Sequence, residues 1–264
     1  MACRTKLTIA YLGRSFSGWQ RQPAARTVQG EIERAVMELT GGRRLAVIGA
    51  GRTDAGVHAA GQVAHVDLPV AIPTSIVPKI LNARLAPDVR VRSAIAVGDT
   101  FHARTSAVGK HYAYRLRWPP SALPWRDMRA FFDRLPRRPE VVEAACRLLP
   151  GRRDWSSFTV PDAARRGAVR TVFRIDCRWR SNGLDLDVFG DGFVRYQVRR
   201  MVGALLAVGA GALSIADLSQ LIESPSPGAP LPTAPARGLT LERVYYRRTE
   251  NLVSPEGPAA PRRP

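Results

Sequence analysis

The sequence predicts a mixed α+β protein with two compact halves. Its 264 residues, of which 45% are apolar, can bury a substantial core and suit two units of ordinary size. Segments with apolar residues at every second position, as in half-buried strands, alternate with segments of helical period. Both halves show this mixture, without a detectable sequence repeat. We therefore expect one half over 1–105, a second over 106–248, and a proline-containing disordered tail over 249–264.

The first half is expected to open as strand, loop and helix. Leu7, Ile9 and Tyr11 alternate as in a strand, and a loop broken by glycine and serine follows, with 19–22 exposed. Thr27 is suited to cap the helix after it, and Gly41-Gly42 end that helix. The next expected elements are a strand over 45–48, a strand over 62–68, a helix over 75–84 and a strand over 89–97.

The second half is expected to open with a strand over 110–118, because Tyr112, Tyr114, Leu116 and Trp118 share one face at period two. The expected elements that follow are a helix over 141–148, strands over 170–179 and 184–189, helices over 193–208 and 215–222, and a strand over 239–246. The proline-rich stretch 224–235 is expected to be a surface loop.

The charge of the chain indicates a polyanionic partner. Lys and Arg number 40 against 22 Asp and Glu, which gives a formal net charge of +18. Most of the excess is arginine, which forms forked hydrogen bonds to phosphate and stacks on bases, so nucleic acid is favoured over a membrane. Plain solubility, or an arginine-rich composition, is the alternative explanation.

The cysteines and the length of the apolar stretches narrow the class of protein. Cys3, Cys146 and Cys177 are odd in number and far apart, which argues against a disulfide framework and a cysteine metal site. We expect no leader peptide and no membrane span, since the longest apolar stretch, 201–213, is too short. A soluble protein of the reducing cytoplasm fits these features.

The most informative motif is the octapeptide Gly51-Arg52-Thr53-Asp54-Ala55-Gly56-Val57-His58. A glycine on each side permits a tight turn and close approach of a large ligand, so Asp54 is the first catalytic candidate. A nucleophilic aspartate must stay ionised in a partly desolvated pocket, which requires a nearby cation. The alternative is that Asp54 only stabilises a turn through bonds to the backbone.

Three further residues complete the candidate site. Arg199, in the arginine-rich segment 193–200, would supply the cation, and Tyr112 would stack on a base and pass a proton through its oxygen. Arg52 lies on the same turn as Asp54. The alternatives are a core role for Tyr112 and a solvated helix face for Arg199.

Metal and nucleotide cofactors are not expected. His58 and His65, taken with Asp54 and Asp67, have no familiar metal-ligand spacing. A dinucleotide-binding loop would need a third glycine, which Gly49-Ala50-Gly51 lacks. An NTP-binding loop would need an earlier glycine and a following Ser or Thr, which Gly109-Lys110 lacks. Neither NAD nor NTP use is therefore expected.

The octapeptide, followed by Gly61-Gln62-Val63, resembles the signature loop of TruA-type tRNA pseudouridine synthases, which isomerise uridines in the anticodon stem-loop. Further matches in family order span residues 7–246. They are Gly18-Trp19-Gln20-Arg21-Gln22, Leu81-Asn82-Ala83, Phe101-His102-Ala103-Arg104, Tyr112-Ala113-Tyr114, Asp154-Trp155-Ser156-Ser157-Phe158, Phe193 with Val198-Arg199, and Ala236-Arg237-Gly238-Leu239.

The resemblance implies the pseudouridine synthase fold: two related α+β halves, a continuous and mostly antiparallel sheet, and a basic central cleft. It also implies a homodimer that binds tRNA, no cofactor, and modification at tRNA positions 38 to 40. Asp54 would be the catalytic aspartate, Arg52 would hold the extruded uridine, Tyr112 would be the active-site tyrosine, and Arg199 the partner of the aspartate. The remaining expected substrate contacts are Gln20, Arg21, Phe101, His102 and Arg104.

Some positions depart from the family pattern. Leu12 stands where many relatives carry an acidic residue, and 195–197 replaces a segment that often contains His or Met. Arg200 stands in place of Asn or Lys and is expected to add a phosphate contact. Two alternative functions are a non-catalytic tRNA-binding or tRNA-folding module, and a synthase of the same fold that acts on another RNA.

Overall fold

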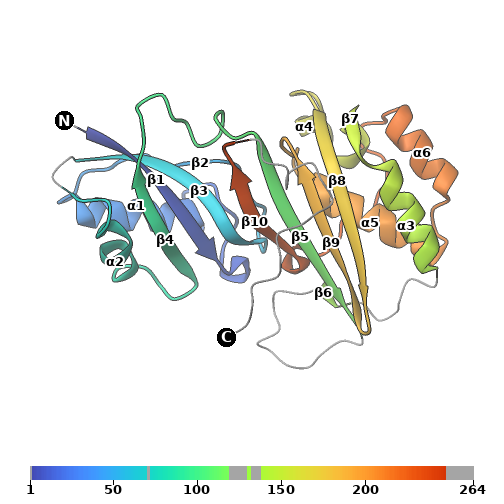
Figure 1. Cartoon of the computed structure of the whole chain (residues 1–264), viewed down its shortest axis with the longest axis horizontal. Helices are drawn as coiled ribbons and strands as arrows, with labels where there is room; N and C mark the ends of the chain where they lie inside the picture. Colours follow the sequence, from blue (N-terminus) through green and yellow to red (C-terminus); the bar gives the residue numbers. More distant parts are fainter. Residues whose placement is uncertain (1, 70–71, 119–129, 132–137, 248–264) are drawn as a thin grey trace. The chain divides into compact units, whose positions relative to one another are not determined.

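The computed structural model describes residues 2–69, 72–118, 130–131 and 138–247, and the predicted tail over 249–264 lies outside them (Figure 1). The chain divides into two compact units. Unit 1 comprises Met1–Ala107, Ser121–Phe131 and Pro235–Tyr246, and unit 2 comprises Val108–Pro120, Phe132–Ala234 and Arg247–Pro264.

The sheet of unit 1 has the strand order β4-β1-β3-β10. Its strands are β1 (Ala2–Tyr11), β3 (His58–Pro69), β4 (Val89–Ala96) and β10 (Leu239–Tyr245). Strand β1 is antiparallel to β3 and β4, whereas β10 is parallel to β3. The short strand β2 (Ile48–Gly49) also pairs with β3. In the pairing of β1 with β3, Tyr11 lies opposite Ala59, near the start of β3, and Lys6 lies opposite His65, nearer its end.

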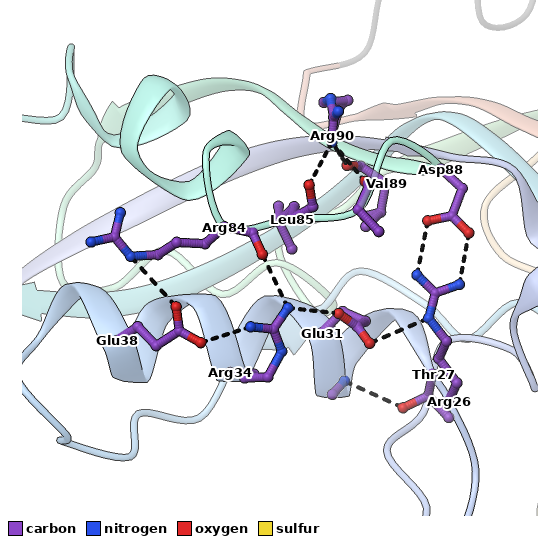
Figure 2. Close-up of polar contacts among 12 residues, drawn as sticks. Arg26, Thr27, Glu31, Arg34, Glu38, Arg84, Leu85, Asp88, Val89 and Arg90 are labelled. Atoms are coloured by element: carbon purple, nitrogen blue, oxygen red, sulfur yellow. Dashed lines mark hydrogen bonds and ion pairs between the residues drawn. The ribbon is translucent and has the colours of Figure 1, made fainter.

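Helices α1 (Val28–Leu39) and α2 (Val77–Asn82) belong to unit 1. The predicted cap of α1 is confirmed, because the Thr27 hydroxyl accepts a hydrogen bond from the Gly30 N–H (3.3 Å). Figure 2 shows a ladder of ion pairs along the polar face of α1, linking it to the loop before β4. The members of the ladder are Arg26, Glu31, Arg34, Glu38, Arg84 and Asp88.

Unit 2 contains the strand order β5-β9-β8-β7, with every neighbouring pair antiparallel. These strands are β5 (Gly109–Arg117), β7 (Gly151–Asp154), β8 (Val169–Arg180) and β9 (Gly183–Gly190). The helices α3 (Pro139–Leu148), α5 (Gln197–Ala210) and α6 (Ile215–Glu223) lie together beside this sheet in Figure 1. Tyr112, Tyr114 and Leu116 are buried, which confirms these three residues of the predicted face, whereas β5 ends before Trp118. Shorter elements are α4 (Pro161–Ala164), β6 (Ala130–Phe131), and the 3-10 helices η1 (Gly13–Ser15), η3 (Ser156–Phe158) and η4 (Ala236–Gly238).

Both units mix helices with mostly antiparallel strands, which confirms the predicted α+β class. Several predicted boundaries are wrong. The strand expected over 62–68 begins four residues earlier, at His58, and the helix expected over 75–84 is the shorter α2. The strand expected over 45–48 is reduced to β2, at Ile48–Gly49. The helix expected from residue 193 begins four residues later, because Tyr196 has a left-handed backbone conformation (φ 64°) that no α-helix continues.

The proline-rich stretch 224–235 is not simply a surface loop. Ala229, Leu231 and Ala234 in it are buried. Its Pro232 carbonyl lies so near Gly203 of α5 that a Cβ there would come within 2.0 Å of the oxygen. This glycine therefore lets the stretch pack closely against α5.

Candidate active site

Asp54 lies on the loop that joins β2 to β3. The Val57 N–H donates to the Asp54 carbonyl (3.1 Å), and Gly56 has a left-handed conformation (φ 80°), so the chain turns sharply just after the carboxylate. The Asp54 residue is half-buried and Arg52 is exposed. The loop thus presents a carboxylate and a guanidinium two residues apart.

The segment 13–19 holds this loop through backbone hydrogen bonds. The Trp19 N–H donates to the Thr53 carbonyl (3.1 Å), and the Gly56 N–H donates to the Phe16 carbonyl (3.4 Å). Gly18 is in the left-handed region (φ 87°), and a Cβ on it would lie 2.7 Å from the Thr53 oxygen. Only glycine allows the two loops to approach this closely.

Buried side chains hold the same loop from the sheet side. The Tyr11 hydroxyl and the Thr53 hydroxyl are 2.8 Å apart, and the Gln62 amide donates to the Gly51 carbonyl (2.9 Å). Tyr11, Thr53 and Gln62 are 3%, 6% and 0% exposed, respectively, so water does not replace these bonds. Burial raises the pKa of Tyr11 to about 12 against the opposing effect of its hydrogen bonds to Thr53 and Gln62, and the phenol stays protonated.

Gln20 and Arg21 lie directly after Trp19 and therefore next to the Asp54 loop. The Gln29 side-chain oxygen accepts from the Gln20 amide (2.7 Å) and from the Arg21 N–H (2.9 Å). The Arg21 guanidinium is 3.4 Å from Glu33 but 62% exposed. Unit 1 thus brings four of the predicted site residues into one neighbourhood. The expectation that 19–22 is exposed is wrong for Trp19, which is 2% exposed and packs over Gly49, and for Gln20, which is half-buried.

Phe101, His102 and Arg104 lie at the other end of β3. The Ala103 N–H donates to His65 Nδ1 (3.1 Å), and the His65 and His102 rings are 4.9 Å apart. At about 3.3 Å per residue, the seven residues from His58 to His65 span roughly 23 Å. These predicted contacts therefore form a second group in unit 1, with Arg104 exposed.

Tyr112 and Arg199 both belong to unit 2 and contact the same short segment before α5. The Tyr112 ring, 8% exposed, packs edge-to-face against Phe193 (centroids 5.4 Å apart). Arg199 lies over the Tyr196 ring (5.3 Å), and its Nε donates to the Ala234 carbonyl (2.7 Å). The left-handed turn at Tyr196 therefore orients the first turn of α5, which carries Arg199.

Two residues that depart from the family pattern have structural contacts. Nη1 of Arg200 donates to the carbonyls of Ser157 (3.3 Å) and Thr159 (2.8 Å), and the expected phosphate contact stays a prediction. Gln197 is 1% exposed, and its side-chain oxygen accepts from the Val194 N–H (2.9 Å). Both side chains stabilise the start of α5.

Within the described part of the chain, no cluster of three or more His, Cys, Asp or Glu side chains is arranged to hold a metal ion. The Nδ1 atoms of His58 and His65 accept backbone hydrogen bonds instead. The described helices include none long and apolar enough to cross a bilayer.

Sequence reasoning assigned no role in the site to Tyr11, Thr53 or Gln62. One indication was available: Gln62 is a polar residue on the same face of the strand as the apolar Ala64, Val66 and Leu68, and buried polar side chains are normally hydrogen-bonded. The partner of Gln62 depends on strand register, which the sequence does not provide.

A half-buried carboxylate beside an exposed guanidinium, on a tightly held loop of a strongly basic chain, is typical of an enzyme that acts on a polyanion. The family model for tRNA pseudouridine synthase matches residues 7–106 and 145–247, which include Asp54 and Arg199 but not Tyr112. The chain belongs to the tRNA pseudouridine synthase family, whose members are isomerases.

Relatives named tRNA pseudouridine synthase A match nearly the whole chain. The protein of Bacillus velezensis is 40% identical over 245 residues (92% of this chain and 99% of that one). That of Bacillus licheniformis is 40% identical over 244 residues, with 92% and 99% coverage. That of Geobacillus kaustophilus is 39% identical over 246 residues, with 93% and 95% coverage. A solved archaeal box H/ACA sRNP Nop10-Cbf5 complex is a distant match (TM-score 0.32, 11% identity, 79% of this chain and 43% of that one).

Proposed function

We propose that this chain converts uridine to pseudouridine in the anticodon stem-loop of tRNA, at positions 38 to 40, with Asp54 as the catalytic carboxylate. The observation that carries the proposal is the Asp54 loop. It joins a half-buried carboxylate to an exposed arginine, and hydrogen bonds hold it on two sides. The net charge of +18 suits a polyanionic substrate.

The reaction is an isomerisation and needs no cofactor. The bond from N1 to C1′ of the ribose breaks, the uracil turns within the site, and C5 bonds to C1′. C5 loses a proton and N1 gains one, so atoms and electrons balance without a redox partner. Asp54 attacks either C6 of the uracil or C1′ of the sugar, and Asp54 or Tyr112 accepts the C5 proton.

We assign distinct roles to the other residues. Arg52, which is exposed, holds the extruded uridine or its phosphate, and Tyr112 stacks on the base. Arg199 pairs with the Asp54 carboxylate and keeps it ionised. Gln20 and Arg21 contact RNA beside the Asp54 loop, while Phe101, His102 and Arg104 contact a more distant part of the substrate.

The wider assembly is also part of the proposal. Two copies of the chain act as a homodimer that binds tRNA. A cytoplasmic location is supported by Cys3, Cys146 and Cys177, all of which are free thiols.

The experiment that tests the function is release of tritium from tRNA labelled at C5 of uridine. Asp54→Asn should abolish release while tRNA binding stays within about tenfold, roughly 1.4 kcal/mol, because the change is nearly isosteric and removes a negative charge from an RNA site. Asp162→Asn, at an exposed aspartate of α4, is the matched control and should react like the wild type.

Each contrary result has a clear meaning. Turnover by Asp54→Asn above about a few per cent of wild type would remove Asp54 as the catalytic carboxylate. A wild-type chain that binds tRNA without releasing tritium would be a binding module. Release only from another labelled RNA would identify a synthase with a different substrate.

A further inference from the structure

We propose that Tyr11 and Gln62 are positioning residues, which fix the Asp54 loop through a buried network of hydrogen bonds to Thr53 and Gly51. The inference rests on the proposed function, since it assumes that Asp54 is the catalytic group. Neither side chain is assigned to substrate contact; both act through the backbone of the loop.

The network reaches the loop at the two residues that flank Arg52. The Tyr11 hydroxyl lies 2.8 Å from the Thr53 hydroxyl, and Thr53 directly precedes Asp54. The Gln62 amide donates to the Gly51 carbonyl at 2.9 Å and approaches the Tyr11 hydroxyl at 3.5 Å. A change at either anchor is therefore transmitted directly to the residues before the carboxylate.

The anchors belong to the rigid part of unit 1. Gln62 lies within β3 opposite Ile9, and Tyr11 ends β1 opposite Ala59, so each is fixed by strand pairing. Both are buried, and a polar group left without its partner in such a place costs more than the bond contributes. The network thus favours one loop position over the alternatives.

The Tyr11 ring and the Tyr11 hydroxyl have different structural roles: the ring packs in the core, and the hydroxyl contacts the loop. The ring packs against Phe16 and Trp19, with centroids 6.3 Å away in each case, and belongs to the core. The hydroxyl alone reaches Thr53. Tyr11→Phe therefore removes the loop contact while it keeps the packing.

The experiment compares kcat and KM for tRNA in variants of the network. Tyr11→Phe and Thr53→Val should each lower kcat by about tenfold or more with KM nearly unchanged, because small displacements of a reacting group are costly. The double variant should lose little more than either single one, since both remove the same bond. Thr53→Ser keeps the hydroxyl and should retain most of the activity.

Thr5→Val is the matched control. Thr5 is a fully buried residue of β1, the strand that also contains Tyr11. Its hydroxyl donates to the Cys3 carbonyl (3.2 Å), remote from the Asp54 loop. This variant should lose stability without losing kcat. Equal loss of kcat in Thr5→Val and Thr53→Val, or wild-type kcat in Tyr11→Phe, would overturn the proposal.

A second measurement separates this inference from the proposed function. Amide hydrogen exchange over 51–57 should be faster in Tyr11→Phe than in the wild type, with exchange in α1 unchanged. Unchanged exchange over 51–57 contradicts the inference even if the enzyme is active. Faster exchange in a chain without turnover on tRNA supports the network and contradicts only the function.

Discussion

Arg26 and Asp88 form a two-pronged ion pair that joins the residue before the α1 cap to the loop leading into β4 (Figure 2). The two N–H···O distances are 2.7 and 2.9 Å. The same guanidinium lies 4.3 Å from the Phe16 ring centroid, and Phe16 accepts a hydrogen bond from the Asp54 loop. The hydrogen bond from Arg26 lowers the pKa of Asp88. The pair thus supports the segment that holds the candidate carboxylate.

Loss of this pair should destabilise unit 1. We expect Asp88→Asn to lower the free energy of unfolding by about 1 kcal/mol, because Asp88 is only 20% exposed and its two bonds to Arg26 are weakened. Urea unfolding at neutral pH measures the difference. Asp162→Asn, which removes an exposed ion pair with Arg166, should cause no measurable change. Equal effects of the two variants would contradict this expectation.

Unit 2 should lose stability in acid through Asp187. Burial opposes ionisation of this carboxyl, but the hydrogen bond from His111 and the charge of Arg115 prevail and lower its pKa to about 2. A carboxyl whose folded pKa lies below its unfolded value of about 3.9 stabilises the fold above that value. This contribution, about 2 kcal/mol, is lost as the pH falls from about 4 to about 2.

The measurement is the unfolding free energy as a function of pH. Asp187→Asn should reduce stability at pH 7 and flatten the loss between about pH 4 and pH 2. Asp162→Asn again serves as the control, because its carboxyl is 63% exposed. An acid transition that is unchanged in Asp187→Asn would show that other groups cause it.

Binding of tRNA should depend steeply on salt. Log affinity should fall by about 0.7 to 0.9 units per unit of log salt for each phosphate contact. Arg21→Ala and Arg104→Ala should lower affinity more than kcat at saturation, since both side chains are exposed and belong to the proposed RNA contacts. Arg166→Ala removes the same charge from an exposed arginine of unit 2 and should change the slope least. An affinity for tRNA that does not change with salt concentration would show that the positive charge of the chain does not contribute to binding.

Replacement of Arg52 by alanine and replacement of Arg199 by alanine should impair the reaction in different ways. Arg52→Ala should be partly rescued by a stem-loop whose target uridine is already unpaired, because less stacking and pairing energy must then be overcome. Arg199→Ala should show no rescue, since the loss of its cation raises the cost of ionising Asp54 on every substrate. Single-turnover rates on matched paired and unpaired stem-loops decide the question. Equal rescue of both variants would reject this division of roles.

Periodicity was sufficient to predict much of the fold. Helix α1 and its Thr27 cap, and the buried face of β5, follow from local residue spacing. The start of α5 does not, because Tyr196 adopts a left-handed conformation that tertiary packing must stabilise. Burial of Trp19 likewise depends on Gly49, a residue distant in sequence.

The candidate site shows the same division. Asp54 and Arg52 were identifiable from a glycine-bounded motif, because the motif itself determines the turn. Tyr11, Thr53 and Gln62 meet only through the register of β1 on β3, and a slip of one residue would turn each strand side chain to the other face of the sheet. The proposed catalytic residues of the loop are therefore easier to predict from the sequence than the residues that hold the loop in place.

The position of β10 in the chain has a consequence for synthesis. Thr240 of β10 pairs with His58, at the end of the Asp54 loop, so that edge of β3 is completed only after β10 has emerged from the ribosome. By then β5, β7, β8 and β9 have emerged, and unit 2 can fold around its own antiparallel pairs first. A nascent chain from which β10 has not yet emerged therefore carries the Asp54 loop without the strand that pairs beside it.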